Sequence, residues 1–496
     1  MRGKTAWIGD LCILTLVATS RLALEPPILP TYDSVNFALA LEHFDPAAHQ
    51  PQPPGYPLFV LLLRWINLTL VHPVDALAMA GVIGSAIAVA ACWRLGRAMF
   101  GEWAGVAVAV LLLVHPTLWY AGVANPVRTF LAAGSAVTAL LLWRALRNRS
   151  GLDAAVAAGA LAVAAGFRPE LLLYLSPLWI YVASKVAWTP TAVRRTLALF
   201  AVGLLAWLGP LAVTAGGPVP LWRLNAGYLA ERSGDAFTLR QLGLAAAWTF
   251  GGALCWVWAL GLRALPSFRL RKPSPEALPF LAVWTAPGFL FQALAHIHHP
   301  DQALQAAPPV CLAGAYVLTH WRTPFASRDW AVAGLLLASG WISFLGFRHP
   351  WPGLERSTGY FDQIELYRRF AADGLTAIEE AAEKGRIVLL AADPYLITRR
   401  HLGYYFPETP IVDLLDGSGG PVLYQGLRRA APPGGTAVIP LPADGTAIAV
   451  PPPGTHWDDD AAGQGRIARD RGVFKIPLEP NLKFTFLGRC FRTPAQ

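Results

Sequence analysis

The sequence predicts an all-α bundle of membrane helices followed by a smaller soluble α/β domain. The chain is 54% hydrophobic and only 14% charged, with a mean hydropathy of +0.42, whereas about a quarter of the residues of a soluble domain are charged. Its apolar residues form blocks of about 20, the length that a membrane helix needs. These blocks stop near Phe347. We therefore predict a membrane domain over residues 1–348 and a soluble domain over residues 349–496.

The apolar blocks predict about 11–12 membrane helices. They cover residues 6–24, 76–93, 104–121, 127–143, 152–166, 170–184, 196–214, 241–262, 278–296, 304–320 and 330–347. A further stretch, 56–71, is short and bracketed by prolines. The first block has a rival interpretation as a cleaved signal peptide, but it is long for one and no clear cleavage site follows.

The distribution of basic residues predicts the orientation. Lysine and arginine crowd one set of alternate connections, such as those after segments 76–93 and 127–143, and are sparse in the opposite set. Cytoplasmic loops carry this excess. The prediction is a multi-pass protein of the inner (plasma) membrane, with a cytoplasmic N-terminus and a periplasmic or extracellular C-terminal domain. This orientation requires that segment 56–71 does not cross fully. The basic residues lie at the ends of apolar segments, where they determine orientation, and they form no separate basic patch. We therefore expect no nucleic-acid partner.

The soluble domain contains one clear supersecondary unit. Residues 386–415 include the apolar run RIVLLAAD, a polar helical stretch and the second apolar run IVDLL. Short apolar runs on either side of a helical pattern are typical of a strand–helix–strand unit. An Arg399–Arg400 pair on this helix is expected to be ordinary exposed surface.

The first outer loop is the most informative segment. It reads TYDSVNFALALEHFDPAAHQPQPPGYPLF over residues 31–59. Its opening predicts an amphipathic helix along the membrane surface, with Phe37, Ala40, Leu41 and Phe44 on one face. Four prolines then keep the chain extended up to the next apolar segment.

The order of these motifs resembles the GT-C membrane glycosyltransferases. An acid after the first helix and HQPQPPGYPLF (49–59) resemble the superfamily of protein O-mannosyltransferases and aminoarabinose transferases. WRLGRAMFG (93–101) is similar to a motif that ends an early helix there, and GFRPE (166–170) to a turn between two short helices. The resemblance implies a GT-C-like bundle. It also implies an inverting transfer of a hexosyl or pentosyl unit from a polyprenyl-phosphate donor to an acceptor at the outer membrane face.

Within this resemblance Asp33 is the expected catalytic base for the acceptor hydroxyl. The structural alternative is that Asp33 merely caps the following helix. Asp45 is the second candidate acid, although its place before Pro46 is typical of a helix stop. His49, Gln50 and Tyr56 of the proline-rich motif are expected to contact substrate.

Two arginines and a histidine are expected to hold the donor phosphate. Arg128 and Arg168 fall at predicted outer helix ends, where a guanidinium can grip phosphate oxygens. The alternative is a snorkelling side chain or a salt bridge, for instance of Arg168 with Glu170. His299 lies in the polar turn HIHHPDQ (296–302).

The same turn offers other contacts. Its Gln302 is expected to contact substrate. Its residues His296, His298 and Asp301 are alternatives for donor contact or for a divalent metal. No metal ligand set is predicted and no cofactor is expected.

One position departs from the superfamily pattern. Asn125 stands in AGVANPVRTF (121–130) where relatives often carry a second acid. The departure argues against a metal-dependent mechanism and keeps an inactive GT-C-like scaffold as an alternative. A polytopic transporter or lipid flippase is the other alternative, although the chain lacks the internal repeats that transporters usually show. The sequence does not identify the sugar, or whether the acceptor is a lipid, a glycan or a protein.

Overall fold

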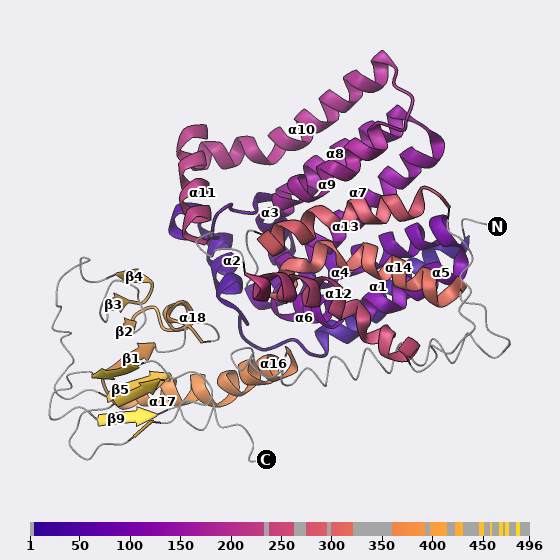
Figure 1. Cartoon of the computed structure of the whole chain (residues 1–496). Coiled ribbons are helices and arrows are strands. Elements are labelled where there is room, and N and C mark those ends of the chain that lie inside the picture. Colours follow the sequence, from indigo (N-terminus) through magenta and orange to yellow (C-terminus); the bar gives the residue numbers. More distant parts are fainter. Residues whose placement is uncertain are drawn as a thin grey trace. The chain divides into compact units, whose positions relative to one another are not determined.

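A computed structural model of the chain (Figure 1) describes residues 4–232, 238–261, 274–294, 299–320, 360–391, 397–413 and 422–429, together with five short strands between residues 446 and 486. The chain divides into two compact units. The first comprises residues 1–25 and 36–361, and the second comprises residues 26–35 and 362–496. The predicted domain boundary at residue 348 and the predicted span 330–347 lie outside the described residues.

The first unit is a helical bundle, as predicted. Its helices follow the apolar blocks of the sequence within a few residues at most ends. They are α1 (Lys4–Leu22), α3 (Pro57–Leu70), α4 (Pro73–Phe100), α5 (Glu102–Leu113), α6 (Pro116–Ala124), α7 (Pro126–Asn148), α8 (Gly151–Phe167), α9 (Glu170–Ala183), α10 (Pro190–Thr214), α11 (Pro218–Arg232), α12 (Leu239–Gly261), α13 (Ala277–Leu294) and α14 (Ala307–His320). Helix α2 (Tyr32–Glu42) begins in the second unit and continues in the first.

Several of these helices have the dimensions of membrane spans. Among the described residues, α4, α7, α10 and α13 are long and apolar enough to cross a membrane, and the bent pair α5–α6 makes a fifth candidate. Helix α10 packs against α8 on one side (Figure 1) and exposes apolar side chains such as Leu197 and Val213 on the other. The chain is an integral membrane protein. The number of crossings and their direction remain predictions.

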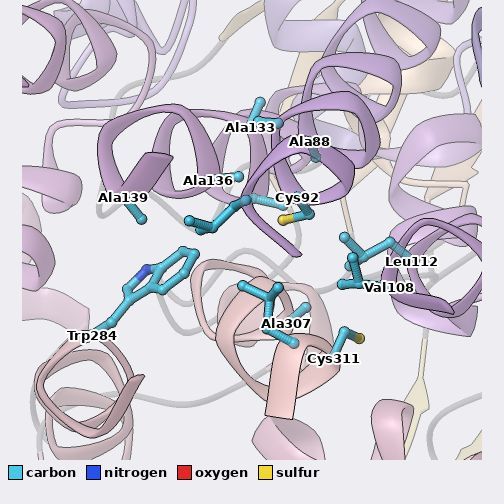
Figure 2. Close-up of a cluster of buried hydrophobic side chains, with 14 of the residues drawn as sticks. Ala88, Cys92, Val108, Leu112, Ala133, Ala136, Ala139, Trp284, Ala307 and Cys311 are labelled. Atoms are coloured by element: carbon cyan, nitrogen blue, oxygen red, sulfur yellow. The ribbon is translucent and has the colours of Figure 1, made fainter. Parts of the chain in front are cut away.

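The core of the bundle joins helices that are distant in sequence. Figure 2 shows small side chains of α4 and α7, among them Ala88 and Ala136, facing Trp284 of α13 and Ala307 of α14. Small residues let membrane helices approach closely. The free cysteines Cys92 and Cys311 lie buried in this core, with Cys311 beside Ala307 in Figure 2.

The predicted span 104–121 is not one straight helix. It breaks into α5 and α6, which meet at an angle of 53°. Pro116 lacks a backbone N–H and disfavours helical geometry in the residue before it. The Leu113 carbonyl near the break accepts a hydrogen bond from the Arg21 guanidinium at 2.9 Å. The bend therefore follows from Pro116, and the hydrophobic pattern alone does not predict it.

Helix α3 ends close to where α1 ends. Asp75 in the first turn of α4, which starts two residues after α3, interacts electrostatically with Glu25, just beyond α1. Burial, reinforced by the Asp75 carboxylate, raises the pKa of Glu25 to about 7. The C-terminal end of α3 thus lies at the same end of the bundle as the loop that begins at residue 23. That segment 56–71 does not cross the membrane stays a prediction.

The second unit contains the predicted strand–helix–strand motif. Strand β1 (Ile387–Ala391) leads through α18 (Arg399–Tyr405) to the parallel strand β2 (Pro410–Asp413). The sheet has the order β4–β3–β2–β1–β5–β9. The remaining elements are helices α16 (Tyr360–Arg369) and α17 (Leu375–Lys384), joined by a π-helical turn over Phe370–Gly374, and strands β3 (Val422–Gln425), β4 (Arg428–Arg429), β5 (Thr446–Val450), β6 (Trp457–Asp458), β7 (Arg466–Arg469), β8 (Gly472–Lys475) and β9 (Lys483–Phe486).

A buried histidine stabilises the start of α18. The Nδ1 atom of His401 accepts a hydrogen bond from the Thr398 backbone N–H at 3.2 Å. His401 is fully buried, and its burial lowers its pKa to about 3. An interaction with the Leu29 backbone opposes this effect less strongly. The ring is therefore neutral in the folded protein throughout the neutral range.

We expect the Gly81→Ala substitution to force α4 and α6 apart. A Cβ at this position lies 2.1 Å from the Gly122 carbonyl oxygen, a backbone atom that cannot rotate away. Overpacking of this kind costs about 1–3 kcal/mol, so the thermal midpoint of the purified protein should fall. Gly209→Ala on α10, where nothing lies within 4 Å of the new Cβ, is the matched control and should leave the midpoint unchanged.

The second unit should lose stability as the pH falls below about 6.5. In the unfolded chain His401 takes up a proton near its ordinary pKa of 6.5, whereas the folded unit resists protonation down to about 3. Stability is therefore fully present above pH 6.5 and declines by about 1.4 kcal/mol for each pH unit below it. Thermal unfolding between pH 7.5 and 5 should show a steeper decline for wild type than for His401→Gln. Equal slopes would contradict the assignment.

Candidate functional site

Asp33 lies in the first turn of α2 but does not cap it. The Thr31 hydroxyl accepts a hydrogen bond from the Ser34 backbone N–H at 3.0 Å, so Thr31 is the capping residue. The interpretation of Asp33 as the cap is therefore wrong. Its half-buried carboxylate makes no hydrogen bond or ion pair with any part of the chain that the structure describes.

Asp45, the second candidate acid, is engaged in a turn, as the sequence predicts. Its carboxylate accepts hydrogen bonds from the backbone N–H groups of Ala47 at 2.9 Å and Ala48 at 3.3 Å. Its backbone pairs with that of Gln50 through bonds of 2.7 and 2.8 Å. Gln50 therefore has a structural role through its main chain. The neighbouring His49 presents its ring edge to Tyr228 of α11, with centroids 6.0 Å apart.

Tyr56 and Arg168 meet in the bundle. The Arg168 guanidinium lies 4.8 Å from the centre of the Tyr56 ring, a cation–π contact. Arg168 is almost fully buried at the end of α8 and forms an ion pair with Glu170. The salt-bridge alternative for Arg168 is thus correct. Tyr56 also interacts electrostatically with Arg128, so the two predicted arginines lie near one tyrosine.

Arg128 belongs to a polar cluster that also contains Asn125 and Asp301. The Asn125 amide donates a hydrogen bond to Oδ2 of Asp301 at 2.9 Å. The Arg128 Nε lies 3.8 Å from the same oxygen. Asp301 is buried, and its Oδ1 has no partner among the described residues. A carboxylate distant in sequence therefore lies beside the asparagine that stands where relatives often carry an acid.

The histidine-containing turn forms the short 3₁₀ helix η2 (Pro300–Gln305), which begins after His299. The His299 backbone N–H donates to Oε1 of Gln302 at 3.3 Å, and the Gln302 carbonyl accepts from Gln292 of α13 at 2.7 Å. The His299 side chain is exposed. His296 and His298 lie outside the described residues. Within the described part of the chain, no group of three or more metal-ligating side chains occurs.

An aromatic stack supports these polar residues. Phe37 of α2 packs on Phe59 of α3 at 4.8 Å, and Phe59 packs on Phe130 of α7 at 5.4 Å. Phe130 in turn stacks flat on Phe167, the residue before Arg168, at 4.7 Å. One turn of α7 separates Phe130 from Asn125. The stack therefore joins four helices. Helices α2 and α3 flank the proline-rich motif, α7 carries Arg128, and Arg168 follows the last residue of α8.

The structure thus brings together most of the predicted site residues within the first unit. One connected set runs from His49 and Tyr56 through Arg168 and Arg128 to the η2 turn. Asp33 belongs to the second unit. Sequence reasoning missed Tyr228, which lies on a helix that the hydrophobic pattern does not predict, and the pairing of Asn125 with Asp301.

Comparison with solved structures identifies the architecture. The chain is similar to ArnT from Cupriavidus metallidurans, solved with undecaprenyl phosphate bound. The TM-score is 0.50 and the identity 16%, over 83% of this chain and 87% of that one. The chain has the GT-C fold. The apo form of that protein gives a TM-score of 0.46 at 14% identity, over 77% and 73% of the two chains.

A more distant likeness is to the oligosaccharyltransferase AglB of Archaeoglobus fulgidus, in complex with an inhibitory peptide and a dolichol-phosphate. The TM-score is 0.40 at 12% identity, over 81% of this chain and 63% of that one. No protein-family model matches the chain, and a search of curated proteins finds no match.

We expect Arg168 and Arg128 to respond differently to substitution. Arg168→Gln leaves Glu170 without its buried partner and should destabilise the protein by on the order of 3 kcal/mol. The double variant Arg168→Gln/Glu170→Gln should recover most of this loss. Arg128→Gln is the matched comparison. It breaks a longer ion pair and leaves Asp301 with its hydrogen bond from Asn125, so it should destabilise the protein less. Thermal midpoints measure both, and an equal loss for the two single variants would contradict the assignment.

Proposed function

We propose that the protein is an inverting glycosyltransferase that moves a sugar from a polyprenyl-phosphate donor to an acceptor hydroxyl. The observation that carries the proposal is the Asp33 carboxylate, which is half-buried, lies in the first turn of α2 and has no bonding partner among the described residues. A base must be free to accept a proton. Asp45 is held by its own turn and Glu170 by Arg168, whereas Asp33 has no such role.

In the proposed reaction Asp33 removes the proton of the acceptor hydroxyl. The acceptor oxygen attacks the anomeric carbon, and the bond from that carbon to the phosphate oxygen breaks. Both electrons of that bond leave with the polyprenyl phosphate. A single displacement inverts the anomeric centre, and no second carboxylate is needed to form a covalent intermediate.

Arg128 is the better of the two candidates for binding the donor phosphate. Its side chain is 14% exposed, against 2% for Arg168, so an incoming anion can reach the Arg128 guanidinium more readily. Arg168 is 2% exposed and engaged by Glu170 and Tyr56. We assign Arg168 to shaping the site and Arg128, with His299, to contacting the phosphate. Gln302, whose side chain closes the η2 turn, remains the proposed substrate contact there.

The proposal extends to location and acceptor class. We propose that transfer takes place at the outer face of a cytoplasmic membrane, consistent with the sparse basic residues of the loops that carry Asp33, Arg128 and Arg168. The acceptor is a lipid, glycan or protein hydroxyl of the cell envelope. No metal or cofactor takes part in the proposed step.

Asp33→Asn should lower transfer by at least about 100-fold, because the amide cannot accept the acceptor proton. The thermal midpoint should not change, since Thr31 still caps α2. The measurement is the consumption of polyprenyl-phosphate sugars in membranes that contain the protein, followed by lipid mass spectrometry.

Asp45→Asn is the matched control and should retain transfer, because asparagine also caps a helix. Wild-type transfer by Asp33→Asn would contradict the proposal. A wild-type protein that consumes no donor but moves a labelled lipid across vesicles would instead favour the flippase alternative. A wild type that binds the donor lipid without consuming or moving it would favour the inactive scaffold.

A further inference from the structure

The segment that carries Asp33 is part of the core of the C-terminal unit. Residues 26–35 belong to that unit, although more than 300 residues separate them from the rest of it. Ile28 is 2% exposed and packs in the same hydrophobic cluster as Phe370, Leu389 and Leu402. An apolar side chain in such a cluster is held by many neighbours at once. The loop is thus anchored by a core residue.

Helix α18 forms a hydrogen bond with the backbone of the next residue, Leu29. The Leu29 N–H donates to the Tyr405 hydroxyl at 2.8 Å. Tyr405 and His401 lie four positions apart on one face of α18, and both interact with the Leu29 backbone. Burial raises the pKa of Tyr405 to about 12, so the hydroxyl remains protonated at neutral pH. The contact is a neutral hydrogen bond in a largely buried setting.

A third contact lies next to the acid itself. The Arg400 guanidinium lies 5.5 Å from the centre of the Tyr32 ring. Tyr32 directly precedes Asp33 and is the first residue of α2. Arg400 is itself largely buried, and burial lowers its pKa. The expectation that the Arg399–Arg400 pair is ordinary exposed surface is therefore wrong, since Arg399 also pairs with Asp413 at 3.2 Å.

We propose that the C-terminal α/β unit is a clamp that positions Asp33, with Ile28, the Leu29–Tyr405 hydrogen bond and the Arg400–Tyr32 contact as its three points of attachment. This inference rests on the proposed function in that it takes Asp33 as the base. Two further bonds make the connection stiff, because the Thr31 cap and its contact with the Ser34 hydroxyl at 2.8 Å fix the turn between Tyr32 and Val35. Tyr405, Arg400 and Ile28 are positioning residues that act through Asp33.

Tyr405→Phe tests the clamp, because it removes one hydroxyl and keeps the ring. Amide hydrogen exchange of the full-length protein should become at least about tenfold faster at Leu29, while exchange in β1 stays at the wild-type rate. Tyr404→Phe, the same change at the neighbouring residue, keeps the Leu29–Tyr405 hydrogen bond and is the matched control, for which exchange at Leu29 should stay at the wild-type rate. Ile28→Ala, which removes the core anchor, should accelerate exchange across residues 26–35.

The second readout separates positioning from simple packing. With the membrane polyprenyl-phosphate sugars that the wild type consumes as the probe, Tyr405→Phe should lower the maximal rate by about 10- to 100-fold. The donor concentration at half-maximal rate should stay the same, because Arg128 and its neighbours are untouched.

Each failure has its own signature. Wild-type exchange at residues 26–35 in both Tyr405→Phe and Ile28→Ala overturns the clamp, whatever the activity. Faster exchange with a wild-type maximal rate overturns the positioning role. Wild-type activity of Asp33→Asn overturns the proposed function and with it the catalytic consequence, while the exchange data still decide whether the clamp exists.

Discussion

A charge buried among apolar helices needs a partner, and this requirement organises the polar residues of the protein. Removing a charged side chain from water costs several kcal/mol unless hydrogen bonds or an opposite charge compensate. Arg168 has Glu170 and the Tyr56 ring, and Arg21 has the Leu113 carbonyl. The Asp33 carboxylate, in contrast, is half-buried and has no bonding partner among the described residues.

The sequence predicts the parts of the fold that depend on local periodicity. Apolar blocks predict the existence of α4, α7 and α10, because a membrane helix needs a long apolar run whatever its neighbours are, although each of these helices extends five to seven residues beyond its block at one end. The β1–α18–β2 unit is predicted for the same reason, since two short apolar runs enclose a polar helix. A helix also forms after Thr31 as expected, but it is not exposed along one face: residues Ser34 to Ala38 are all buried, including the polar Ser34 and Asn36.

What the sequence does not predict depends on partners distant along the chain. Thr31 and Asp33 are both good capping residues, and only the hydrogen bond to Ser34 shows which one caps α2. Asn125 suggests a missing acid, yet the Asp301 carboxylate lies beside it, 176 positions away. No local pattern shows that Ile28 packs in a core formed mainly after residue 366.

In the proposed reaction the same constraint applies to the donor phosphate, which must bind beside arginines that already have acidic partners. The Arg128 Nε and the Asp301 Oδ2 are 3.8 Å apart, which is longer than a hydrogen bond. If Asp301 had only this partner, contact between Arg128 and the phosphate would leave a buried carboxylate without compensation. Asn125 prevents this, because its amide keeps donating to Asp301 at 2.9 Å. In the proposed reaction Asn125 therefore keeps the Asp301 carboxylate compensated while Arg128 contacts the donor phosphate.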